Sequence, residues 1–203
     1  KAKDSIFDEL KDMNLSSPEA KYIGGMTPAS QLRVKDAFIE LKKKPGFEEV
    51  KLIATGGSTG DDNKFIKEQK RKLKDNNLLD YFEILPEYEG EAQHDFYKQV
   101  SLVSVPVRIG EAFGMYLLES MASGVPVVQP ALGAFPEITE LAGGGITYMP
   151  NTPEKLSETW AGLLNDPKKL EQLSINGHAG TKENFNIHSH AAEIIALYES
   201  LKK

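Results

Sequence analysis

Short apolar runs alternate with helical stretches along this chain, and that alternation restricts its fold more than any other feature of the sequence. Strands are predicted at residues 22–23, 50–54, 81–85, 101–107, 125–129 and 146–149. Helices are predicted at residues 30–44, 62–76, 92–99, 114–123, 136–141, 153–164, 167–179 and 189–201. Because strands joined through helices pair in parallel, the expected fold class is α/β: a doubly wound parallel sheet of Rossmann-like type, with helices on both faces.

The length of the chain suits one domain. Its 203 residues can bury one sizeable core, and no internal repeat or low-complexity linker divides them. We expect an N-terminal lead-in over residues 1–20 and a single domain over residues 21–203, with Trp160 in the core under the last helices. No run approaches the roughly 18 apolar residues of a membrane span, and the polar residues 1–14 do not resemble a signal peptide.

Charge and residue usage narrow the class of partner. The formal net charge of −6 argues against nucleic acid, since phosphate contacts need clustered Lys and Arg, and the basic run at residues 42–44 is interpreted as a solvated helix face. Cysteine is absent, which fits a cytoplasmic protein, or one peripheral at a membrane within a longer chain. No metal is expected, because ligand spacing is missing around the four histidines: His94, His178, His188 and His190.

The turn after residues 101–107 is the first candidate site, because ligands of open α/β sheets bind beyond the carboxyl ends of the strands. It runs R-I-G-E-A-F-G from Arg108 to Gly114, where a helix is predicted to begin. The first N–H groups of a helix have no partner inside it, and with the helix dipole they attract an anion such as diphosphate. Gly114 has no side chain to keep a ligand from the backbone. The helix start therefore offers positive potential in an acidic chain.

Two glutamates flank this helix start. Glu111 precedes the helix and Glu119 lies inside it, and an ionised carboxylate suits the neighbouring hydroxyls of a ribose or sugar ring. Surface carboxylates are the ordinary interpretation of such a pair, but Leu117, Leu118 and Met121 indicate a buried helix. Since an unpaired buried carboxylate is costly, Glu119 is expected to have hydrogen-bond partners.

The stretch from Glu111 to Val128, E-A-F-G-M-Y-L-L-E-S-M-A-S-G-V-P-V-V, resembles the E-x7-E signature of retaining family-four glycosyltransferases. The stretch G-A-F-P-E from Gly133 to Glu137 resembles the G-G-x-P-E turn of the same family. The resemblance covers most of residues 21–201 and implies one half of the two-domain GT-B fold. Such enzymes transfer a sugar from a nucleotide-diphosphate sugar with retention of configuration, and they need no metal or other cofactor.

The resemblance also implies a role for each candidate residue. Glu111 is the catalytic candidate, which would contact hydroxyls of the transferred sugar and stabilise an oxocarbenium-like transition state. Glu119 would bind the ribose of the nucleotide. The other donor-binding candidates are Phe113, Gly114, Met115 and Tyr116 at the helix start, Leu85 near the base, and Gly25, Arg33 and Arg108 near the diphosphate. Electrostatic stabilisation of the leaving diphosphate would be a main catalytic contribution.

The resemblance fails at the family's cationic clamp. There a G-R pair, followed five residues later by K-G, holds the diphosphate, whereas this chain has Gly25 in place of the Arg and Ser30 in place of the Lys. Loss of both cations would remove charge-assisted contacts that strengthen in the transition state. Arg33, Lys35 and Arg108 are the candidate substitutes, and a solvated helix face is an equal alternative for the first two.

The leading interpretation is the donor-binding domain of a retaining hexosyltransferase. The acceptor-binding domain of a GT-B enzyme has no counterpart in these 203 residues, so the isolated chain is expected to bind donor weakly and to transfer little sugar. Two alternatives stay open. One is a catalytically degenerate sugar-nucleotide-binding or interaction module, which Gly25 and Ser30 favour. The other is a different GT-B enzyme, such as a sugar-phosphate epimerase or a phosphorylase, although no pyridoxal-binding lysine motif is visible.

Overall fold

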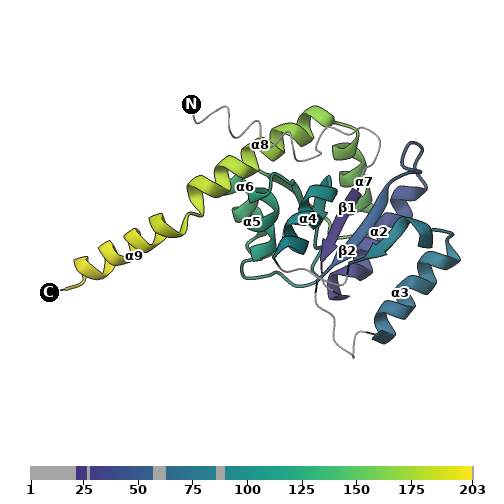
Figure 1. Ribbon diagram of the computed structural model, residues 1–203, viewed down its shortest axis with the longest axis horizontal. Coiled ribbons are helices and arrows are strands. Elements are labelled where there is room, and N and C mark those ends of the chain that lie inside the picture. Colours follow the sequence, from purple (N-terminus) through teal and green to yellow (C-terminus); the bar gives the residue numbers. More distant parts are fainter. Residues whose placement is uncertain (1–21, 27, 57–62, 86–89, 203) are drawn as a thin grey trace.

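Six parallel strands form one sheet in the order β3-β2-β1-β4-β5-β6 (Figure 1). The computed structural model describes residues 22–26, 28–56, 63–85 and 90–202, so the lead-in at residues 1–20 lies outside the described residues. The strands are β1 (Tyr22–Met26), β2 (Lys51–Thr55), β3 (Phe82–Ile84), β4 (Leu102–Ser104), β5 (Val127–Pro130) and β6 (Gly145–Tyr148). This order is that of the doubly wound nucleotide-binding fold, so the predicted α/β class is confirmed.

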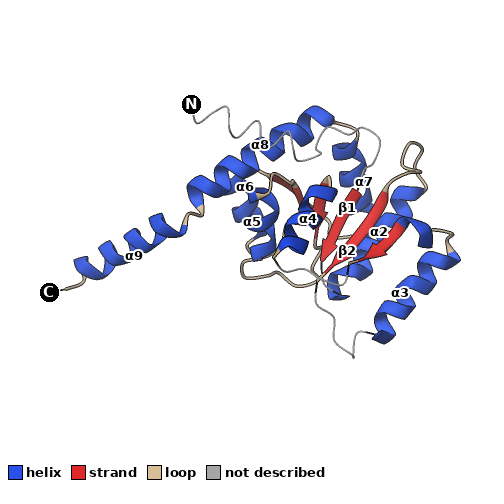
Figure 2. Ribbon diagram, in the orientation of Figure 1, coloured by secondary structure: helices blue, strands red, loops and turns tan. Residues whose placement is uncertain are grey.

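Helices cover both faces of the sheet (Figure 2). They are α2 (Pro28–Lys42), α3 (Asn63–Asp75), the 3-10 turn η2 (Leu79–Tyr81), α4 (Glu91–Gln99), α5 (Met115–Ala122), α6 (Phe135–Ala142), α7 (Pro153–Leu164), α8 (Pro167–Asn184) and α9 (Ile187–Ser200). One face carries α2, α3 and α7, and the other carries α4, α5 and α6. Beyond them α8 packs on α5 and α6, while α9 extends away from the body of the domain (Figure 1).

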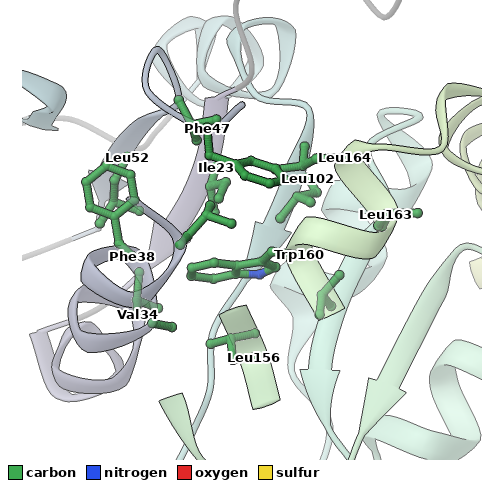
Figure 3. Packing of buried hydrophobic residues seen from close by; sticks show 14 of the residues in the cluster. Ile23, Val34, Phe38, Phe47, Leu52, Leu102, Leu156, Trp160, Leu163 and Leu164 are labelled. Atoms are coloured by element: carbon green, nitrogen blue, oxygen red, sulfur yellow. The ribbon is translucent and has the colours of Figure 1, made fainter. Parts of the chain in front are cut away.

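The two cores follow from the alternation of side chains along each strand. Residues on one face are Ile23, Leu52, Leu102 and Val128, and residues on the other are Ile53, Val103 and Val127. Trp160 of α7 is fully buried in the first core, beside Ile23, Leu102 and Leu156 (Figure 3). Its Nε1 donates a hydrogen bond to Ser104 Oγ at 2.8 Å. The predicted core position of Trp160 is confirmed.

The prediction that the first strand stops at its two glycines is wrong. β1 continues through Gly24 and Gly25 to Met26 because it is paired on both sides, by β2 and by β4. Gly24 also makes room for α4, since a Cβ at this position would lie 2.6 Å from the Phe96 ring. These glycines therefore serve helix–sheet packing rather than a turn.

The fourth strand is shorter than the predicted range of residues 101–107. β4 ends at Ser104, and side chains take over the backbone groups that follow it. The Val105 N–H donates to Gln129 Oε1 at 3.0 Å, and the Val107 carbonyl accepts from Asn151 Nδ2 at 2.9 Å. The chain thus leaves the sheet early, while its position stays fixed by Gln129 of β5 and by Asn151 after β6.

Two helix predictions also need correction. α8 continues past residue 179 to Asn184, because its glycines allow close approach to a neighbouring helix: a Cβ at Gly180 would lie 2.2 Å from the Ala142 carbonyl oxygen. The interpretation of residues 42–44 as a solvated helix face is wrong for Lys42. It is half-buried, and its Nζ lies 3.4 Å from the centroid of the Tyr81 ring.

Candidate functional site

The strand order reverses between β1 and β4, and this switch point brings two strand ends together. Gly25 pairs with Ala54 of β2 on one side and with Ser104 of β4 on the other. In open α/β sheets the crevice beyond the carboxyl ends of the strands at such a point is the usual ligand site. Residues 105–114 leave β4 at this place and lead into α5. The fold therefore puts the predicted loop where a ligand is expected.

The start of α5 presents several unused backbone donors. Gly114 is its N-cap, in the left-handed conformation with φ 86° and ψ 69°, which glycine adopts at little cost. The N–H groups of Phe113, Gly114 and Met115 have no hydrogen-bond acceptor among the residues that the structure describes. Together with the positive end of the helix dipole, these adjacent donors have the arrangement of an anion site.

The backbone of Glu111 is clasped by the turn that precedes α6. Its carbonyl accepts a hydrogen bond from the Ala134 N–H at 3.1 Å. Gly133, with φ 55°, lies so close that a Cβ there would be 2.4 Å from the Glu111 carbonyl oxygen. A Cβ at Gly110 would in turn lie 2.7 Å from the Gly133 nitrogen. The G-A-F-P-E turn therefore holds the loop before α5 in place, backbone against backbone.

The side chain of Glu111 accepts a hydrogen bond from the Tyr116 hydroxyl at its Oε2. Burial raises the pKa of the Tyr116 phenol above its usual range, and the neighbouring Glu111 carboxylate raises that pKa further. Tyr116 is therefore protonated, and a hydrogen-bond donor, throughout the physiological pH range. The catalytic candidate and one of the donor-binding candidates thus contact each other directly.

Glu119 lies one turn inside α5 and is half-buried. Its Oε2 accepts a hydrogen bond from Gln93 Nε2 of α4 at 2.9 Å. The prediction that Glu119 has a hydrogen-bond partner is confirmed. At 1.5 Å of rise per residue, Glu119 is about 6 Å along the helix axis from Met115, so it is within reach of a ligand whose anionic group occupies the helix start.

The cationic candidates divide into three cases. Lys35 is buried and forms an ion pair with Asp36 at 2.7 Å, and burial lowers its pKa. Its ammonium is close enough to Lys72 of α3 for repulsion, so it belongs to the contact between α2 and α3 and is not a substitute for the family's lysine. Arg108 is exposed on the loop before α5. Arg33 lies in α2, while its side chain and that of Ser30 are outside the described residues.

The remaining candidates carry apolar side chains. Phe113 and Met115 are exposed at the start of α5, and the Phe113 ring meets the edge of Phe185 with centroids 6.4 Å apart. Leu85 follows β3, where its N–H donates to the Ala54 carbonyl at 2.8 Å and its half-buried side chain packs on the second core. Leu85 is therefore two strands from the switch point, at the outer edge of the sheet.

Comparison with known proteins identifies the family. Glycosyl transferases group 1 matches residues 22–179, which is most of the chain. The chain belongs to this family. This match covers far more than the segment from Glu111 to Glu119, and it confirms the resemblance to glycosyltransferases that this segment indicated.

Several glycosyltransferases share this sequence pattern. The lipopolysaccharide core biosynthesis mannosyltransferase LpsB of Rhizobium meliloti is 30% identical over 192 residues, which is 92% of this chain and 53% of LpsB. A D-inositol 3-phosphate glycosyltransferase of Xylanimonas cellulosilytica is 25% identical over 156 residues, covering 77% of this chain and 37% of the relative. The chain thus spans about half the length of LpsB, and less of the second relative.

Solved structures share the fold. The C-terminal domain of a group 1 glycosyl transferase (LpcC) from Francisella tularensis matches with a TM-score of 0.71 and 22% identity, over 89% of this chain and 92% of that domain. Anabaena HepE, crystallised with UDP and glucose, matches with a TM-score of 0.76 and 19% identity, over 97% of this chain and 52% of HepE. The domain therefore has the architecture of one half of a GT-B glycosyltransferase.

Sequence reasoning missed two contributors to this site. The sequence does not indicate Gln93 as the partner of Glu119, nor does it indicate that Gly133 packs against the backbone of Glu111. Both contacts join segments far apart in the chain, and nothing in their spacing marks them. Within the described residues, no helix is long and apolar enough to cross a membrane, and no three His, Asp or Glu side chains gather as a metal site.

Proposed function

We propose that this chain is the donor-binding domain of a retaining glycosyltransferase, which holds a nucleotide-diphosphate sugar at the start of α5. The observation behind this proposal is the set of unsatisfied N–H groups at Phe113, Gly114 and Met115, placed between the carboxylates of Glu111 and Glu119. The relatives act as glycosyltransferases by name, and the LpsB relative is a mannosyltransferase, which supports transfer of a hexose.

The diphosphate of the donor would lie against the N–H groups and the dipole of α5. When the bond between sugar and diphosphate breaks, negative charge grows on the leaving diphosphate, and donors already aimed at that position stabilise the transition state. Glu119, oriented by Gln93, would accept hydrogen bonds from the ribose hydroxyls. Glu111 would accept hydrogen bonds from the transferred sugar and stabilise positive charge at its ring.

The proposed reaction uses no metal or other cofactor. The proposed location of the enzyme is the cytoplasm. Arg108 is the remaining described cation near the diphosphate, and its exposure leaves it able to turn toward a ligand. The acceptor would bind on a second domain, since relatives such as LpsB are about twice as long as the matched region. The isolated chain is therefore proposed to bind donor without efficient transfer.

A second candidate function is a sugar-nucleotide-binding or interaction module without catalytic activity. Gly25 favours it, because this residue sits at the end of β1, beside β4, where the family's clamp supplies an arginine. A backbone anion site can bind a diphosphate in its ground state without these cations. The two candidates therefore agree on binding and differ on transfer.

Calorimetric titration of the chain with UDP, GDP and ADP tests the shared part of the proposal. We expect one of the three nucleotides to bind and Glu119→Ala to abolish its binding. Glu68→Ala, which removes an exposed glutamate of α3, is the matched control and is expected to leave the affinity unchanged. Failure of all three nucleotides to bind would refute the donor site. Transfer activity of the full-length protein, with and without Arg108→Ala, then separates the enzyme from the inactive module.

A further inference from the structure

The Tyr116 hydroxyl is the hydrogen-bond partner of the Glu111 carboxylate, and no other described residue bonds to that side chain. The two residues stand five positions apart, one on the loop before α5 and the other in its first turn. The hydroxyl engages Oε2 and leaves Oε1 of Glu111 for a ligand. One oxygen of the carboxylate is thus held by the protein itself.

Tyr116 is fixed in position by its surroundings. Its ring is half-buried and meets the edge of Phe135, with centroids 6.5 Å apart and planes at 70°. A Cβ added to Gly114 would lie 3.4 Å from the same ring, so the helix start also borders it. At the backbone, the Tyr116 carbonyl accepts a hydrogen bond from the Tyr97 hydroxyl at 3.4 Å. The packing of its ring and this backbone contact therefore fix the direction from which the phenol approaches Glu111.

Glu111 is consequently held at both ends. Its backbone is clasped by Gly133 and Ala134, and its carboxylate by Tyr116. A glutamate side chain loses considerable rotamer freedom when it is ordered, and a ligand that must order it bears that loss in its own affinity. A carboxylate ordered in advance spares the ligand this loss and presents one oxygen in a defined direction.

We propose that Tyr116 is the positioning residue of the donor-sugar subsite: its hydroxyl holds one oxygen of Glu111 so that the other accepts a hydroxyl of the transferred sugar. The inference rests on the proposed function and deepens it. It gives Tyr116 a role that is exerted through Glu111 rather than by donating a hydrogen bond to the sugar, because its hydroxyl proton is donated to Glu111.

The proposal separates the sugar from the nucleotide. Glu119, Gln93 and the N–H groups at the start of α5 would serve the nucleoside diphosphate, and the hydroxyl of Tyr116 donates its hydrogen bond to Glu111 instead. Loss of that hydroxyl therefore leaves affinity for a nucleoside diphosphate intact. It lowers only the additional affinity that the sugar of a nucleotide sugar provides.

The experiment is calorimetric titration of the 203-residue chain and its variants with UDP, GDP, UDP-glucose and GDP-mannose. Tyr116→Phe keeps the ring against Phe135 and removes only the hydroxyl. We expect it to bind the preferred nucleoside diphosphate as the original chain does, and to bind the matching nucleotide sugar about tenfold more weakly, as for loss of one hydrogen bond to a charged group. Tyr198→Phe, which removes the hydroxyl of an exposed tyrosine of α9, is the control and is expected to change both affinities less than twofold.

A double-variant cycle distinguishes positioning from a general structural effect. If Tyr116 acts through Glu111, then Tyr116→Phe has no further effect on nucleotide-sugar affinity once Glu111→Ala is present. Equal nucleotide-sugar affinity in Tyr116→Phe and in the original chain, with nucleoside diphosphate still bound, would overturn this inference and leave the donor site standing. Additive effects of Tyr116→Phe and Glu111→Ala would overturn it as well. Absence of any nucleotide binding would refute the donor site and this inference together.

Discussion

The Gln93 side-chain amide donates a hydrogen bond to Glu119 Oε2 at 2.9 Å, across 26 residues of sequence. Gln93 lies in the first turn of α4, and Glu119 lies in the middle of α5. Of these two helices on the same face of the sheet, α5 carries the carboxylate and α4 supplies its hydrogen-bond donor. The amide supplies a donor without a charge. It therefore orients the carboxylate and leaves its negative charge in place, as the proposed contact with a ribose requires.

Removal of the Gln93 amide is expected to weaken nucleotide binding. A hydrogen bond to a charged group contributes about 1.5–3 kcal/mol, and part of that energy here serves to hold Glu119 in its binding orientation. Gln93→Ala should therefore raise the dissociation constant of the preferred nucleoside diphosphate roughly three- to tenfold. Gln93→Glu should raise it further, because two carboxylates would then face each other. Calorimetry measures both effects.

Gln99 offers the matched control for these variants. It lies in the last turn of α4, and its Nε2 donates to the Asp95 carbonyl of the same helix at 2.9 Å. Gln99→Ala removes an amide from the same helix without reaching α5, so nucleotide affinity should stay unchanged. Equal weakening by Gln93→Ala and Gln99→Ala would show that α4 stability, rather than the contact with Glu119, determines binding.

A side chain at Gly133 is expected to damage both the fold and the site. Gly133 has φ 55°, and a Cβ there would lie 2.4 Å from the Glu111 carbonyl oxygen and 2.7 Å from its nitrogen. Both neighbours are backbone atoms that cannot turn aside, so Gly133→Ala must displace the loop before α5. We expect a loss of about 1–3 kcal/mol in the free energy of unfolding, measured by denaturant titration, and weaker nucleotide-sugar binding.

Gly162 provides the opposite outcome from the same substitution. It lies inside α7, and a Cβ there would have no atom within 4 Å. Gly162→Ala should raise the free energy of unfolding by about 0.5–1 kcal/mol, because alanine favours the helix and restricts the unfolded chain. If Gly133→Ala were as harmless as Gly162→Ala, the clasp on Glu111 would have no mechanical role.

The hydrogen bond between Trp160 and Ser104 is expected to stabilise the centre of the domain. Ser104 Oγ accepts from the indole at 2.8 Å and donates to the Val128 carbonyl at 2.5 Å, and all three groups are buried. Ser104→Ala leaves the indole N–H and the carbonyl unpaired, which costs about 1–3 kcal/mol. Fluorescence-detected unfolding measures this loss directly, since the chain contains one Trp.

Trp160→Phe completes this test. It removes the indole donor, and it adds the cost of the cavity that a smaller ring leaves in the core. The effects of Ser104→Ala and Trp160→Phe should be non-additive, because each removes a partner of the same hydrogen bond. Simple addition of the two losses in denaturant titrations followed by circular dichroism would show that the hydrogen bond contributes nothing beyond packing.

The fold could be predicted from the sequence because it depends on features that lie close together in the chain. Apolar runs and helical periodicity gave the type and order of the strands and helices correctly. The ends of β1 and β4 were wrong for a shared reason: they depend on partners elsewhere. β1 continues through Gly24 because β2 and β4 pair with it on both sides, and β4 stops at Ser104 because Gln129 and Asn151 take over the next backbone groups.

The site follows the same division. Glu111, Gly114 and Glu119 stand in one short motif, and this motif follows β4 beside the switch point of the sheet, where ligands usually bind in such folds. The residues that orient the motif come from other segments, Gln93 from α4 and Gly133 from the turn before α6. Tyr116 lies within the motif, but a spacing of five residues does not indicate that its hydroxyl contacts Glu111.

Lys42 is expected to make stability depend on pH in the alkaline range. Its ammonium lies 3.4 Å from the centroid of the Tyr81 ring, donates to the Glu48 carbonyl, and is half-buried. Burial lowers the pKa of Lys42 from 10.5 to about 8, and Glu48 and Glu49 offset only part of this effect. The folded protein therefore releases this proton at a lower pH than the unfolded chain does.

The sign of the pH dependence follows from that difference. Below pH 8 both states keep the proton, and the cost of partly burying the ammonium is fully present. Between about pH 8 and 10.5 the unfolded chain binds more protons, so the free energy of unfolding rises with pH. We expect a gain of about 1 kcal/mol for the original chain relative to Lys42→Met, less than the full linkage value because the ammonium is partly hydrated.

Denaturant titrations from pH 7 to pH 10 measure this difference. Lys42→Met keeps an unbranched side chain at this position and removes the titrating group that lies over the rings of Phe38 and Tyr81. Lys43→Met, which removes the exposed neighbouring ammonium, controls for the loss of one positive charge. The free energy of unfolding of the original chain should rise with pH relative to that of Lys42→Met, but not relative to that of Lys43→Met. This outcome would show that burial disfavours the charged form of Lys42. A falling difference would mean that the attraction of the ammonium to Tyr81 outweighs its loss of hydration.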